Sequence, residues 1–562
     1  MSEAAEEFHF SPRPNRASEI NWHAWSKEAF DEARSTGRPI LLSISAVWCH
    51  WCHVMDETTY SHPSVIDLIN RDYVPVRVDN DVRPDINQRY NMGGWPTTAF
   101  LTASGDILTG ATYMPPDQMA SALVRIASYY RTSQAEIASR VLEARKRTAS
   151  GIARSAGELA PGLVDEILDA VRSSYDEEYG GFGGAPKFPQ TEALLLLLEQ
   201  SVVRADDSLR GMAIHSLEKM TGGGTYDHVE GGFFRYSTTQ DWSVPHFEKM
   251  LEDHAGLVQA LALAGMKDEL QKTVGYLDRV LRDPKTGLYA GSQDADEHYY
   301  AMDAEERAQA TAPYVDRRVY TSWNAALAIA LLPIFPIHGE VAPAGADGAA
   351  RTLDSLFKRA YRRGDGMLHA EGVGGQLSDQ VWSLWAAVRA YQHGLGDRWM
   401  EIALDLAAHI EEQYADPELG GYLDHSGKDE LGRLGERIKP LVENSVAAMA
   451  LVELDILLGD PSAPHRERAR RALESVAALP RSYGLMAAVF ARALDRLGRD
   501  PIKVTTKNRE LAHAALAAHP YAVIDPSGDQ RAVVCVGTIC LAPVSTPGAV
   551  RDAIKEATTT RA

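Results

Sequence analysis

Two cysteines separated by two residues, Cys49 and Cys52, are the part of this sequence best suited to chemistry. They enclose His50 and Trp51, follow an apolar run over residues 39–46 and precede an amphipathic stretch. Two cysteines three positions apart at the start of a helix can close a small disulfide ring, and a helix N-terminus favours the thiolate of the first. The pattern therefore predicts dithiol–disulfide exchange, with Cys49 as nucleophile and Cys52 as resolving thiol.

Other interpretations of this motif remain open. The two thiols could be buried and inert, or they could form half of a zinc site, for which no second CxxC or HxxxH partner is obvious. The string Cys49-His-Trp-Cys-His53 also fits the CxxCH attachment pattern of c-type haem, in which His53 would be an axial ligand. That interpretation requires export, and the acidic first seven residues do not resemble a secretion signal. We predict no metal and no cofactor.

Trp95 and Pro96 stand at the entrance of a predicted strand, about 45 residues after the cysteines. A proline in this place, opposite a CxxC loop, is often held cis. Such a bond would present the backbone of Trp95 to a substrate chain in extended form, so we predict that both residues bind substrate. The alternative is an ordinary edge-strand proline.

A second group of chemically capable residues lies within residues 226–248. The group contains Asp227, His228, Arg235, Tyr236, Asp241, Trp242, His246 and Glu248. Aromatic faces stack on sugar rings, carboxylates serve as acid and base in glycoside cleavage, and histidines could move a proton in epimerisation. Other loops would complete the predicted cavity with Asp294, Asp296, Trp323, Asn324 and Asp379. The alternative is that these Asp and His residues cap helices and satisfy buried turns.

Two local expectations concern single pairs of residues. Residues 245–249 are predicted to open a helix, which would place His246 and Glu248 on different faces, so that they form no acid–base pair. Cys535 and Cys540 could approach each other in a hairpin, but we expect reduced, buried thiols. A role in relaying disulfides from the first cysteine pair is a third interpretation.

The composition bounds the class of protein. The chain has 562 residues, too many for one core, with 45% apolar and 24% charged residues, as in ordinary soluble globular proteins. Only four cysteines favour a reducing cytoplasm over a disulfide-stapled secreted protein. A net charge of −20 argues against a nucleic-acid partner. The sequence contains no uncharged apolar run of about 18 residues, so we expect no membrane span.

The elements that must position these residues fall into four regions. Residues 1–20 are predicted to be a flexible leader. Residues 21–150 follow the order of a βαβ unit, a β-hairpin and a closing helix. Residues 160–498 contain twelve helix-period segments joined by repeated acidic, glycine-rich turns, which fit an (α/α)6 toroid, with an open solenoid as competitor. Residues 499–562 are predicted to be a small α/β appendage.

Long motifs carry a resemblance that covers nearly the whole chain. They include Trp48-Cys-His-Trp-Cys-His-Val-Met55, Gly93-Gly-Trp-Pro96, Gly110-Ala-Thr-Tyr-Met-Pro115, Gly181-Phe-Gly-Gly-Ala-Pro-Lys-Phe-Pro189, Val244-Pro-His-Phe-Glu-Lys-Met250 and Thr321-Ser-Trp-Asn324. With them the chain resembles the family of spermatogenesis-associated protein 20 and its bacterial relatives. The resemblance implies a thioredoxin-like domain fused to a six-hairpin, glycosidase-like toroid. It implies no settled activity.

One departure from the thioredoxin pattern concerns proton transfer. Thioredoxins carry a buried carboxylate six residues before the first cysteine, where this chain has Ser43. His50 or His53 would have to accept the proton of Cys52 instead. We also expect His50 to tune Cys49 and Trp51 to cover the disulfide ring.

Three functions follow from these observations. The first is a thiol–disulfide oxidoreductase whose partners are a disulfide-bearing protein or a thioredoxin-reductase-like electron donor. The second is a carbohydrate-active enzyme, a glycoside hydrolase or a sugar 2-epimerase, with a sugar ligand and a regulatory thioredoxin domain. The third is a non-catalytic interaction protein.

Overall fold

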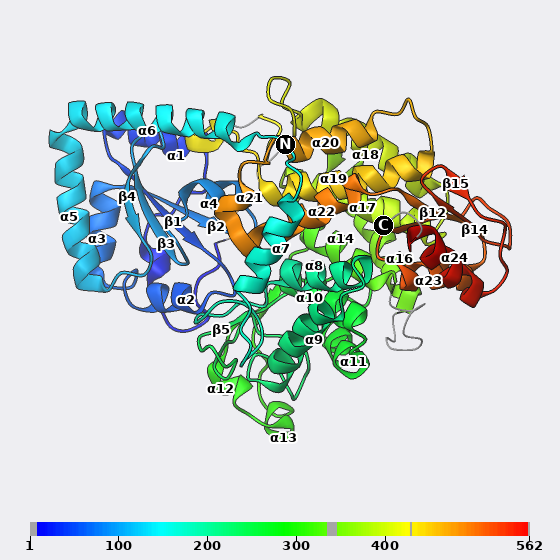
Figure 1. The fold of residues 1–562 in the computed structure, drawn as a ribbon. Coiled ribbons are helices and arrows are strands. Elements are labelled where there is room, and N and C mark those ends of the chain that lie inside the picture. The colour runs from blue at the N-terminus through cyan, green and yellow to red at the C-terminus, as the bar shows by residue number, and fades with distance from the viewer. Residues whose placement is uncertain (1–7, 334–344, 428–429, 560–562) are drawn as a thin grey trace. The chain divides into compact units, whose positions relative to one another are not determined.

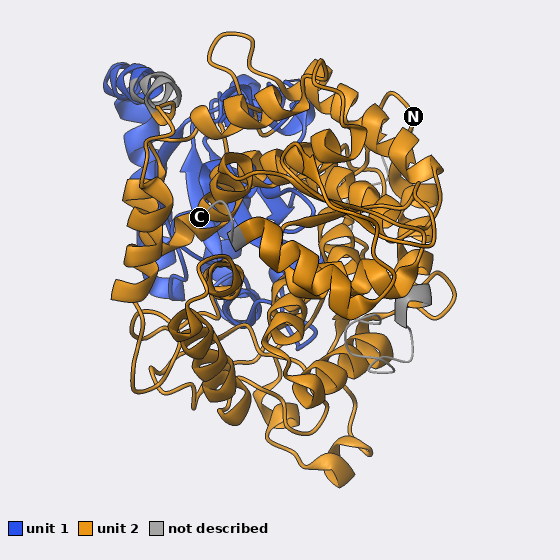
Figure 2. Ribbon diagram, turned by 45° about the vertical axis from the view of Figure 1, so that its right-hand side comes forward, with its two compact units in different colours: residues 1–153, 425–438 blue, residues 154–424, 439–562 orange. Residues whose placement is uncertain are grey.

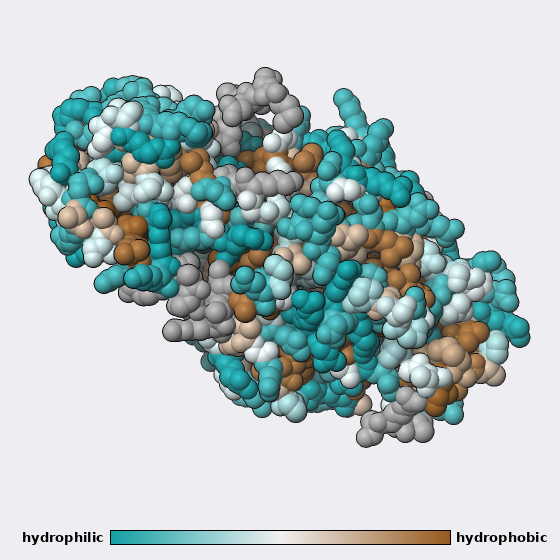
Figure 3. Space-filling view, turned by 90° about the horizontal axis from the view of Figure 1, so that it is seen from above, coloured by the Kyte–Doolittle hydropathy of each residue, from teal (hydrophilic) through white to brown (hydrophobic). Residues whose placement is uncertain are grey.

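The computed structural model describes residues 8–333, 345–427 and 430–559. It divides into two compact units, shown in different colours in Figure 2. Unit 1 comprises residues 1–153 and 425–438, and unit 2 comprises residues 154–424 and 439–562. Among the described residues, no helix is both long enough and apolar enough to span a bilayer. On the face drawn in Figure 3, hydrophobic residues lie in small separate groups among hydrophilic ones.

Unit 1 is built on one four-stranded sheet in the order β2-β1-β3-β4 (Figure 1). Its strands are β1 (Ile40–Ser45), β2 (Val74–Asp79), β3 (Thr97–Leu101) and β4 (Ile107–Ala111). β1 and β2 are parallel, so helices cross over between them, whereas β3 pairs antiparallel with β1 and with β4. The helices are α1 (Lys27–Thr36), α2 (His50–Glu57), α3 (Pro63–Asp72), α4 (Pro84–Tyr90), α5 (Pro116–Thr132) and α6 (Gln134–Ser155). The predicted βαβ unit, hairpin and closing helix are thereby confirmed as a thioredoxin-like fold.

The side chains of β1 alternate between two apolar cores. Ile40, Leu42 and Ile44 join the core formed with α1 and α4, and Leu41 joins the core formed with α3 and α5. This alternation follows from the two-residue period of a strand. Since both faces of β1 are covered, the strand is buried throughout and holds the cysteine loop at its carboxyl end on a rigid base.

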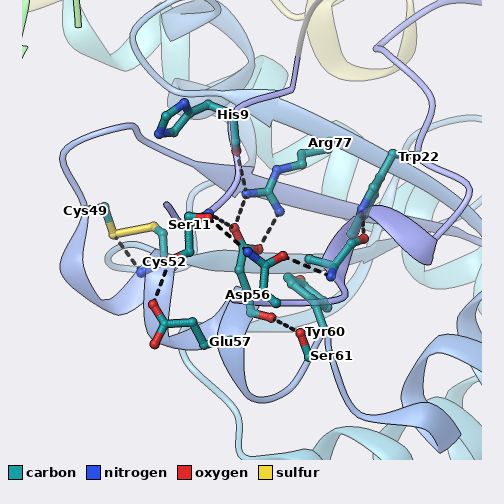
Figure 4. Close-up of polar contacts among 12 residues, drawn as sticks. His9, Ser11, Trp22, Cys49, Cys52, Asp56, Glu57, Tyr60, Ser61 and Arg77 are labelled. Atoms are coloured by element: carbon teal, nitrogen blue, oxygen red, sulfur yellow. Dashed lines mark hydrogen bonds and ion pairs between the residues drawn. A yellow bond between two sulfur atoms is a disulfide. The ribbon is translucent and has the colours of Figure 1, made fainter. Parts of the chain in front are cut away.

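The described part of the predicted flexible leader is ordered, which corrects that prediction. Residues 8–20 include a short 3₁₀ helix, η1 (Ala17–Glu19), and Ala17 joins the second core. The backbone N–H of Ser11 donates to Asp56 over 3.1 Å (Figure 4). Arg77 donates to the carbonyl of His9 over 3.1 Å. These buried partners hold in place residues that the composition alone predicts to be flexible. Residues 1–7 lie outside the described part.

A short segment from the toroid region of the sequence belongs to unit 1, which corrects the uninterrupted toroid range of 160–498. It comprises residues 425–438 and contains the 3₁₀ helix η3 (Gly432–Gly435). Leu434 is buried in the first core of unit 1. Arg89 donates to the carbonyl of Arg433 over 2.9 Å. Leu434, partly buried Leu431 and hydrogen bonds between side chains and backbone groups thus attach this segment.

The helices of unit 2 form two concentric sets. The inner helices are α8 (Thr191–Val203), α10 (Leu251–Ala264), α14 (Thr321–Leu331), α17 (Leu377–Gln392), α19 (Leu441–Leu458) and α22 (Ala488–Gly498). The outer helices are α7 (Leu163–Ser173), α9 (Asp207–Gly222), α11 (Lys267–Tyr276, continued as a π-helix to Leu281), α16 (Gly345–Ala360), α18 (Arg398–Tyr414) and α20 (His465–Glu474). Each inner helix packs against the next in chain order, and α22 packs against α8.

This closed ring confirms the (α/α)6 toroid over the open solenoid for the described part of unit 2. Inner helices such as α14 and α19 are apolar nearly all round, as helices enclosed by other helices must be. Since one outer helix returns the chain between successive inner helices, the inner helices all run in the same direction. Their N-termini therefore gather at one end of the ring, which we call the mouth.

The acidic turns predicted from their repetition are closed by the same kind of β-bridge. The bridges join Tyr175 to Phe182, Tyr226 to Phe233, Arg282 to Tyr289 and Ala415 to Tyr422. In three of these turns the aspartate pairs with a lysine that is buried. The pairs are Asp176–Lys187 at 2.6 Å, Asp227–Lys249 at 2.7 Å and Asp416–Lys439 at 2.8 Å. The turns therefore repeat the same structure as well as the same sequence pattern.

Short elements connect the helices of unit 2. They are β5 (Tyr236–Ser237), β6 (Pro245–His246), β7 (Lys249–Met250), β8 (Ser292–Gln293), α12 (Glu297–Tyr300), α13 (Ala304–Arg307), β9 (Val315–Asp316), β10 (Tyr361–Arg362), β11 (Gly366–Met367) and α21 (Pro480–Tyr483). The predicted C-terminal α/β region contains β12 (Ile502–Thr505), α23 (Arg509–Ala518), β13 (Ala522–Asp525), β14 (Val533–Val536), β15 (Ile539–Cys540) and α24 (Pro547–Thr559). Its sheet has the order β13-β12-β14-β15, with β12 and β13 parallel. This region is part of unit 2.

Candidate functional sites

The Cys49–Cys52 pair is a disulfide at the N-terminus of α2 (Figure 4). Cys49 is the N-cap residue, and its sulfur accepts a hydrogen bond from the backbone N–H of Cys52 over 3.2 Å. The same N–H would stabilise negative charge on the Cys49 sulfur, together with the positive end of the helix dipole. The predicted small ring and its place at a helix N-terminus are both present.

Aromatic residues surround this disulfide. Cys49 and Cys52 are only 4% and 2% exposed, whereas Trp51 between them is 47% exposed. The ring of Trp51 lies 5.2 Å from that of Tyr113, centroid to centroid. Trp48 donates a hydrogen bond to Asp81 over 2.7 Å. Trp51 is thus the exposed member of the motif, and both sulfurs lie beneath the surface.

Trp95 and Pro96 lie beside the cysteine loop, where the sequence predicts them. β3 begins at Thr97, which pairs with Ile44 near the end of β1, so the two preceding residues flank the start of that loop. The Trp95 ring contacts the Trp48 ring edge-on, with centroids 5.6 Å apart. The Trp95–Pro96 peptide bond is cis, as expected.

The groups near Cys52 that could carry a proton are restricted. Asp56 lies one helical turn after Cys52, but both of its carboxylate oxygens accept from Arg77 over 2.9 Å (Figure 4). Arg77 is the neighbour of Ser43 on the adjacent strand. Burial and the nearby His9 lower the pKa of His53 to about 3, so its imidazole is neutral at physiological pH and a weak base. Half-buried His50 is therefore the candidate that remains from the sequence prediction.

Cys535 and Cys540 form a second disulfide, which corrects the expectation of reduced, buried thiols. They face each other directly across β14 and β15. β15 is exposed at the edge of its sheet, and Cys540 is exposed with it. The hairpin that the sequence offered as an alternative is the reason for the pairing.

Several residues of the predicted toroid cavity have structural roles. Asp227 is 3% exposed and holds Lys249 together with Arg307, at 2.7 and 2.8 Å. Asn324 exchanges two hydrogen bonds with the backbone of Tyr289. Asp379 accepts from the backbone N–H of Ser322, from that of Gln376 and from His369, which ties the N-termini of α14 and α17 together.

Five other predicted residues make contacts that serve the local geometry of the chain. Trp242 is fully buried and donates to the carbonyl of Tyr179. His228 is exposed and contacts the Gly223 carbonyl. Asp296 caps α12, and the carboxylate of Asp294 accepts the N–H of Ala295. Exposed Asp241 binds Ser243 in its own turn.

His246 and Glu248 do form a hydrogen-bonded pair, contrary to the prediction. The helix begins only at Leu251, and residues 245–250 are extended, so positions i and i+2 point to the same side. The His246 ring stacks on Tyr236 at 4.8 Å, and Tyr236 stacks on Phe188 at 4.6 Å. The neighbouring Arg235 donates its N–H to the carbonyl of Glu248. These four predicted residues are therefore brought together.

Three carboxyl groups at the mouth escaped the sequence prediction. Glu252 and Asp253 lie in the first turn of α10, and Glu443 lies in the first turn of α19, on the opposite side of the ring. Desolvation by the surrounding protein, with Asp253 as a second cause, raises the pKa of Glu252 to about 7. Desolvation likewise raises the pKa of Asp253 to about 6 and that of Glu443 to about 7.

These pKa values are unusual for their position. A helix N-terminus favours the charged carboxylate, so desolvation outweighs the helix dipole at all three residues. Glu252 itself is exposed to solvent, and Asp253 and Glu443 are half-buried, so they remain accessible. Only their shared position in first turns of inner helices could have marked them in the sequence. Half-buried Trp323 occupies the equivalent turn of α14.

Comparison with known proteins bears on the sequence resemblance. Residues 12–149 match the family model Thioredox_DsbH, described as a protein of unknown function, DUF255. Spermatogenesis-associated protein 20 of Homo sapiens is 35% identical over 311 residues, which cover 49% of this chain and 39% of that protein. The uncharacterized protein B0495.5 of Caenorhabditis elegans is 35% identical over 306 residues, 49% of this chain and 41% of that one. The chain thus spans about two fifths of the length of these relatives, and the resemblance is confirmed.

Solved structures give more distant matches. Cellobiose 2-epimerase from Bacillus thermoamylovorans is 13% identical with a TM-score of 0.45, covering 57% of this chain and 86% of that chain. Cellobiose 2-epimerase from Spirochaeta thermophila is 14% identical with a TM-score of 0.45, covering 62% and 95%. A thioredoxin from Thermus thermophilus is 21% identical with a TM-score of 0.19, covering 20% and 90%. The toroid itself is defined by the closed ring of helices described above.

Proposed function

Because this chain is a relative of spermatogenesis-associated protein 20 and its N-terminal residues match a thioredoxin-type family, we propose that unit 1 catalyses thiol–disulfide exchange. The observation that carries the proposal is the Cys49–Cys52 disulfide at the N-terminus of α2, with the Cys52 N–H directed at the Cys49 sulfur. A pair of inert structural thiols would need neither the helix N-terminus nor the amide donor. The substrate class is a protein disulfide.

The exchange proceeds in two balanced steps from the reduced pair. The Cys49 thiolate attacks one sulfur of the substrate disulfide; that bond breaks, a mixed disulfide forms, and the other substrate sulfur leaves as a thiolate and takes a proton. Cys52, after losing its proton, attacks the Cys49 sulfur. The Cys49–Cys52 disulfide forms, and the second substrate thiol is released. Two electrons have passed to the substrate, and an external dithiol electron donor restores the reduced pair.

His50 is the proton carrier in this proposal. Asp56 is committed to Arg77, and the pKa of His53 is too low for that residue to take a proton near neutrality. His50 precedes Trp51 within the motif and is half-buried, so it retains contact with solvent. Trp95 and Pro96, beside the cysteine loop, are proposed to receive the substrate backbone.

Insulin reduction by the full-length protein, with dithiothreitol as donor, tests the proposal. Cys49→Ser should abolish the activity, and Cys52→Ser should accumulate a mixed disulfide that mass spectrometry detects. Cys535→Ser is the matched control, because it removes a cysteine of the second disulfide, and it should retain the wild-type rate. Equal rates for the wild type and Cys49→Ser would refute the proposal.

A second candidate function is acid–base chemistry on a sugar at the mouth of the toroid. The observation that favours it is the set of carboxyls at Glu252, Asp253 and Glu443, whose pKa values are raised to about 6 or 7. A carboxyl with such a pKa can keep its proton near neutral pH and act as a general acid. The half-buried ring of Trp323 would supply a face for sugar stacking.

A sugar panel with product analysis tests this second candidate. Turnover by the full-length protein should be lost in Glu252→Gln and in Glu443→Gln. It should survive in Glu418→Gln, which alters an exposed glutamate on a turn. Turnover that all three variants retain, or no turnover of any sugar by the wild type, would remove this candidate.

A further inference from the structure

A cavity of about 330 Å³ lies in unit 2 where the C-terminal end of α17 meets the loop between β12 and α23. The backbone N–H of Ile524 in β13 donates to the side chain of Gln392, the last residue of α17, over 3.1 Å, which fixes the two walls together. β12 and β13 are parallel, so the loops after their carboxyl ends meet at this edge of the sheet. Ligands of open α/β sheets bind at that edge.

The lining of this cavity contains two cationic side chains. Lys507 and Arg509 follow β12, and both are exposed. In the part of the chain that the structure describes, neither side chain makes a hydrogen bond or an ion pair. Asp397 is the one acidic residue among the lining residues. These two cations lie at one cavity and no carboxylate of the described residues binds either of them, so their positive charge is available to an anionic ligand.

Two histidines line the same cavity. Desolvation, with Arg389 as a second cause, lowers the pKa of His393 to about 3, and desolvation with Arg509 lowers that of His513 to about 4. Both rings are therefore neutral near pH 7, and each can donate one N–H to an anion without requiring a proton from solvent.

The start of α23 adds a favourable field but few contacts. Asn508 caps the helix by accepting from the N–H groups of Glu510 and Leu511, over 3.0 and 3.3 Å, so these donors are already used. The helix dipole still favours negative charge here. The contacts to a ligand must therefore come from the side chains. Leu516 and Pro526 give the cavity an apolar wall as well.

We propose that this cavity binds a small phosphate ester, with its phosphate held by Lys507 and Arg509 and its organic part against Leu516 and Pro526. A dianion matches two cations, and the arginine fork matches two phosphate oxygens. The proposal is independent of the chemistry at the cysteines and at the mouth, because none of its residues belongs to either site.

Isothermal titration calorimetry of the full-length protein tests this proposal with three probes: ribose 5-phosphate, ribose and inorganic phosphate. Ribose 5-phosphate should bind and ribose should not. The double variant Lys507→Gln/Arg509→Gln should weaken the binding of ribose 5-phosphate about tenfold or more. Lys285→Gln, which alters an exposed lysine on a turn of the toroid, is the matched control and should change nothing.

Three results would overturn the proposal. They are no binding of ribose 5-phosphate, equal affinity in the double variant and the wild type, and equal affinity for ribose and ribose 5-phosphate. Equal affinity for inorganic phosphate and ribose 5-phosphate would assign the site to the free anion and overturn its assignment to an ester. Lys507 and Arg509 are exposed, so the variants should fold, and the single substitutions measured separately should each retain part of the affinity.

Discussion

We expect Trp51 to influence how a reaction partner reaches the Cys49–Cys52 disulfide. Its ring is the exposed part of the motif, whereas both sulfurs are almost fully buried. A sulfur is attacked along the axis of the disulfide bond, so the attacking thiolate must reach sulfurs that lie beneath the surface, next to the exposed Trp51. Reactivity in this motif is therefore limited by access as well as by the state of the thiol.

Replacing Trp51 by alanine should expose the disulfide and accelerate its reduction by glutathione about threefold or more. Alkylation of the freed thiols followed by mass spectrometry gives the rate. Tyr483→Ala, which removes a comparably exposed aromatic residue of unit 2, should leave the rate unchanged. A slower reduction of the Trp51→Ala protein would show that the ring recruits the partner instead of shielding the sulfurs.

Glu443 makes the stability of the protein depend on pH. Its folded-state pKa is raised to about 7, so between about pH 4.5 and pH 7 the folded protein holds a proton that the unfolded chain has released. The free energy of unfolding therefore falls as the pH rises through this window. Glu443→Gln removes this poorly solvated charge. It should increase the free energy of unfolding at pH 8 by about 1–3 kcal/mol, and the melting temperature with it.

The same variant tests whether ionisation of Glu443 is the cause of the gain in stability. The gain from Glu443→Gln should disappear below about pH 4.5, where the glutamate is protonated in both the folded and the unfolded state. Differential scanning calorimetry at pH 8 and pH 4.5 measures both values, with Glu418→Gln as the exposed control. A gain that is the same at both pH values would exclude ionisation as its cause.

At the scale of elements, the repeated aspartate turn explains why acidic residues cluster at helix connections. Asp227 accepts backbone N–H groups of its own turn through one carboxylate oxygen and binds Lys249 through the other. Arg307 also reaches it. Asp176 and Asp416 repeat the lysine contact elsewhere in the ring. The aspartates thus hold connections between helices.

Asp227→Asn should destabilise unit 2 by about 3 kcal/mol, because buried Lys249 loses its carboxylate partner. Among the described residues, Arg307 then keeps only the carboxylate of Glu230, at 3.4 Å. Thermal unfolding followed by circular dichroism measures the shift. Asp268→Asn, in an exposed position on α11, is the control and should be nearly neutral. If Asp227→Asn keeps the wild-type melting temperature, the carboxylate does not stabilise the turn, and its candidacy for catalysis would be restored.

Periodicity and repetition made the elements predictable, whereas individual contacts were not. Twelve helix-period segments yielded the toroid, and the cysteine spacing yielded the disulfide at a helix N-terminus. The His246–Glu248 pair was missed because the helix starts later than its apolar pattern indicates, at Leu251. Glu252 and Glu443 were missed because desolvation is the main cause of their raised pKa values, and desolvation depends on how the helices pack around them. No local pattern marks such packing.

At the scale of the whole molecule, the two units are interleaved in sequence. The chain leaves unit 1 after residue 153, returns for residues 425–438 and then leaves again. Leu434 from this returning segment is buried in a core of unit 1, and a buried leucine stabilises a fold by about 1.5–3 kcal/mol. Arg433 adds a hydrogen bond from its N–H to Tyr90, over 2.7 Å. Unit 1 is therefore incomplete without residues that follow it by more than 270 positions.

A fragment comprising residues 8–153 should be less stable than the same fragment carrying residues 425–438 on a flexible linker. The expected difference is about 2 kcal/mol or more, from Leu434 alone. Urea titration followed by tryptophan fluorescence measures it. A linked version with Leu434→Ala should lose most of the gain. Identical midpoints for all three proteins would show that the segment adds nothing to the unit.

The returning segment also determines when unit 1 can be completed during translation. A ribosome makes Cys49 and Cys52 early, yet the last part of unit 1 emerges only after most of the ring has been translated. During that interval the apolar residues that share a core with Leu434 lack this packing partner. Unit 1 should therefore reach its full stability only after translation has passed residue 438, and a chaperone that binds nascent chains should find an exposed apolar surface there until then.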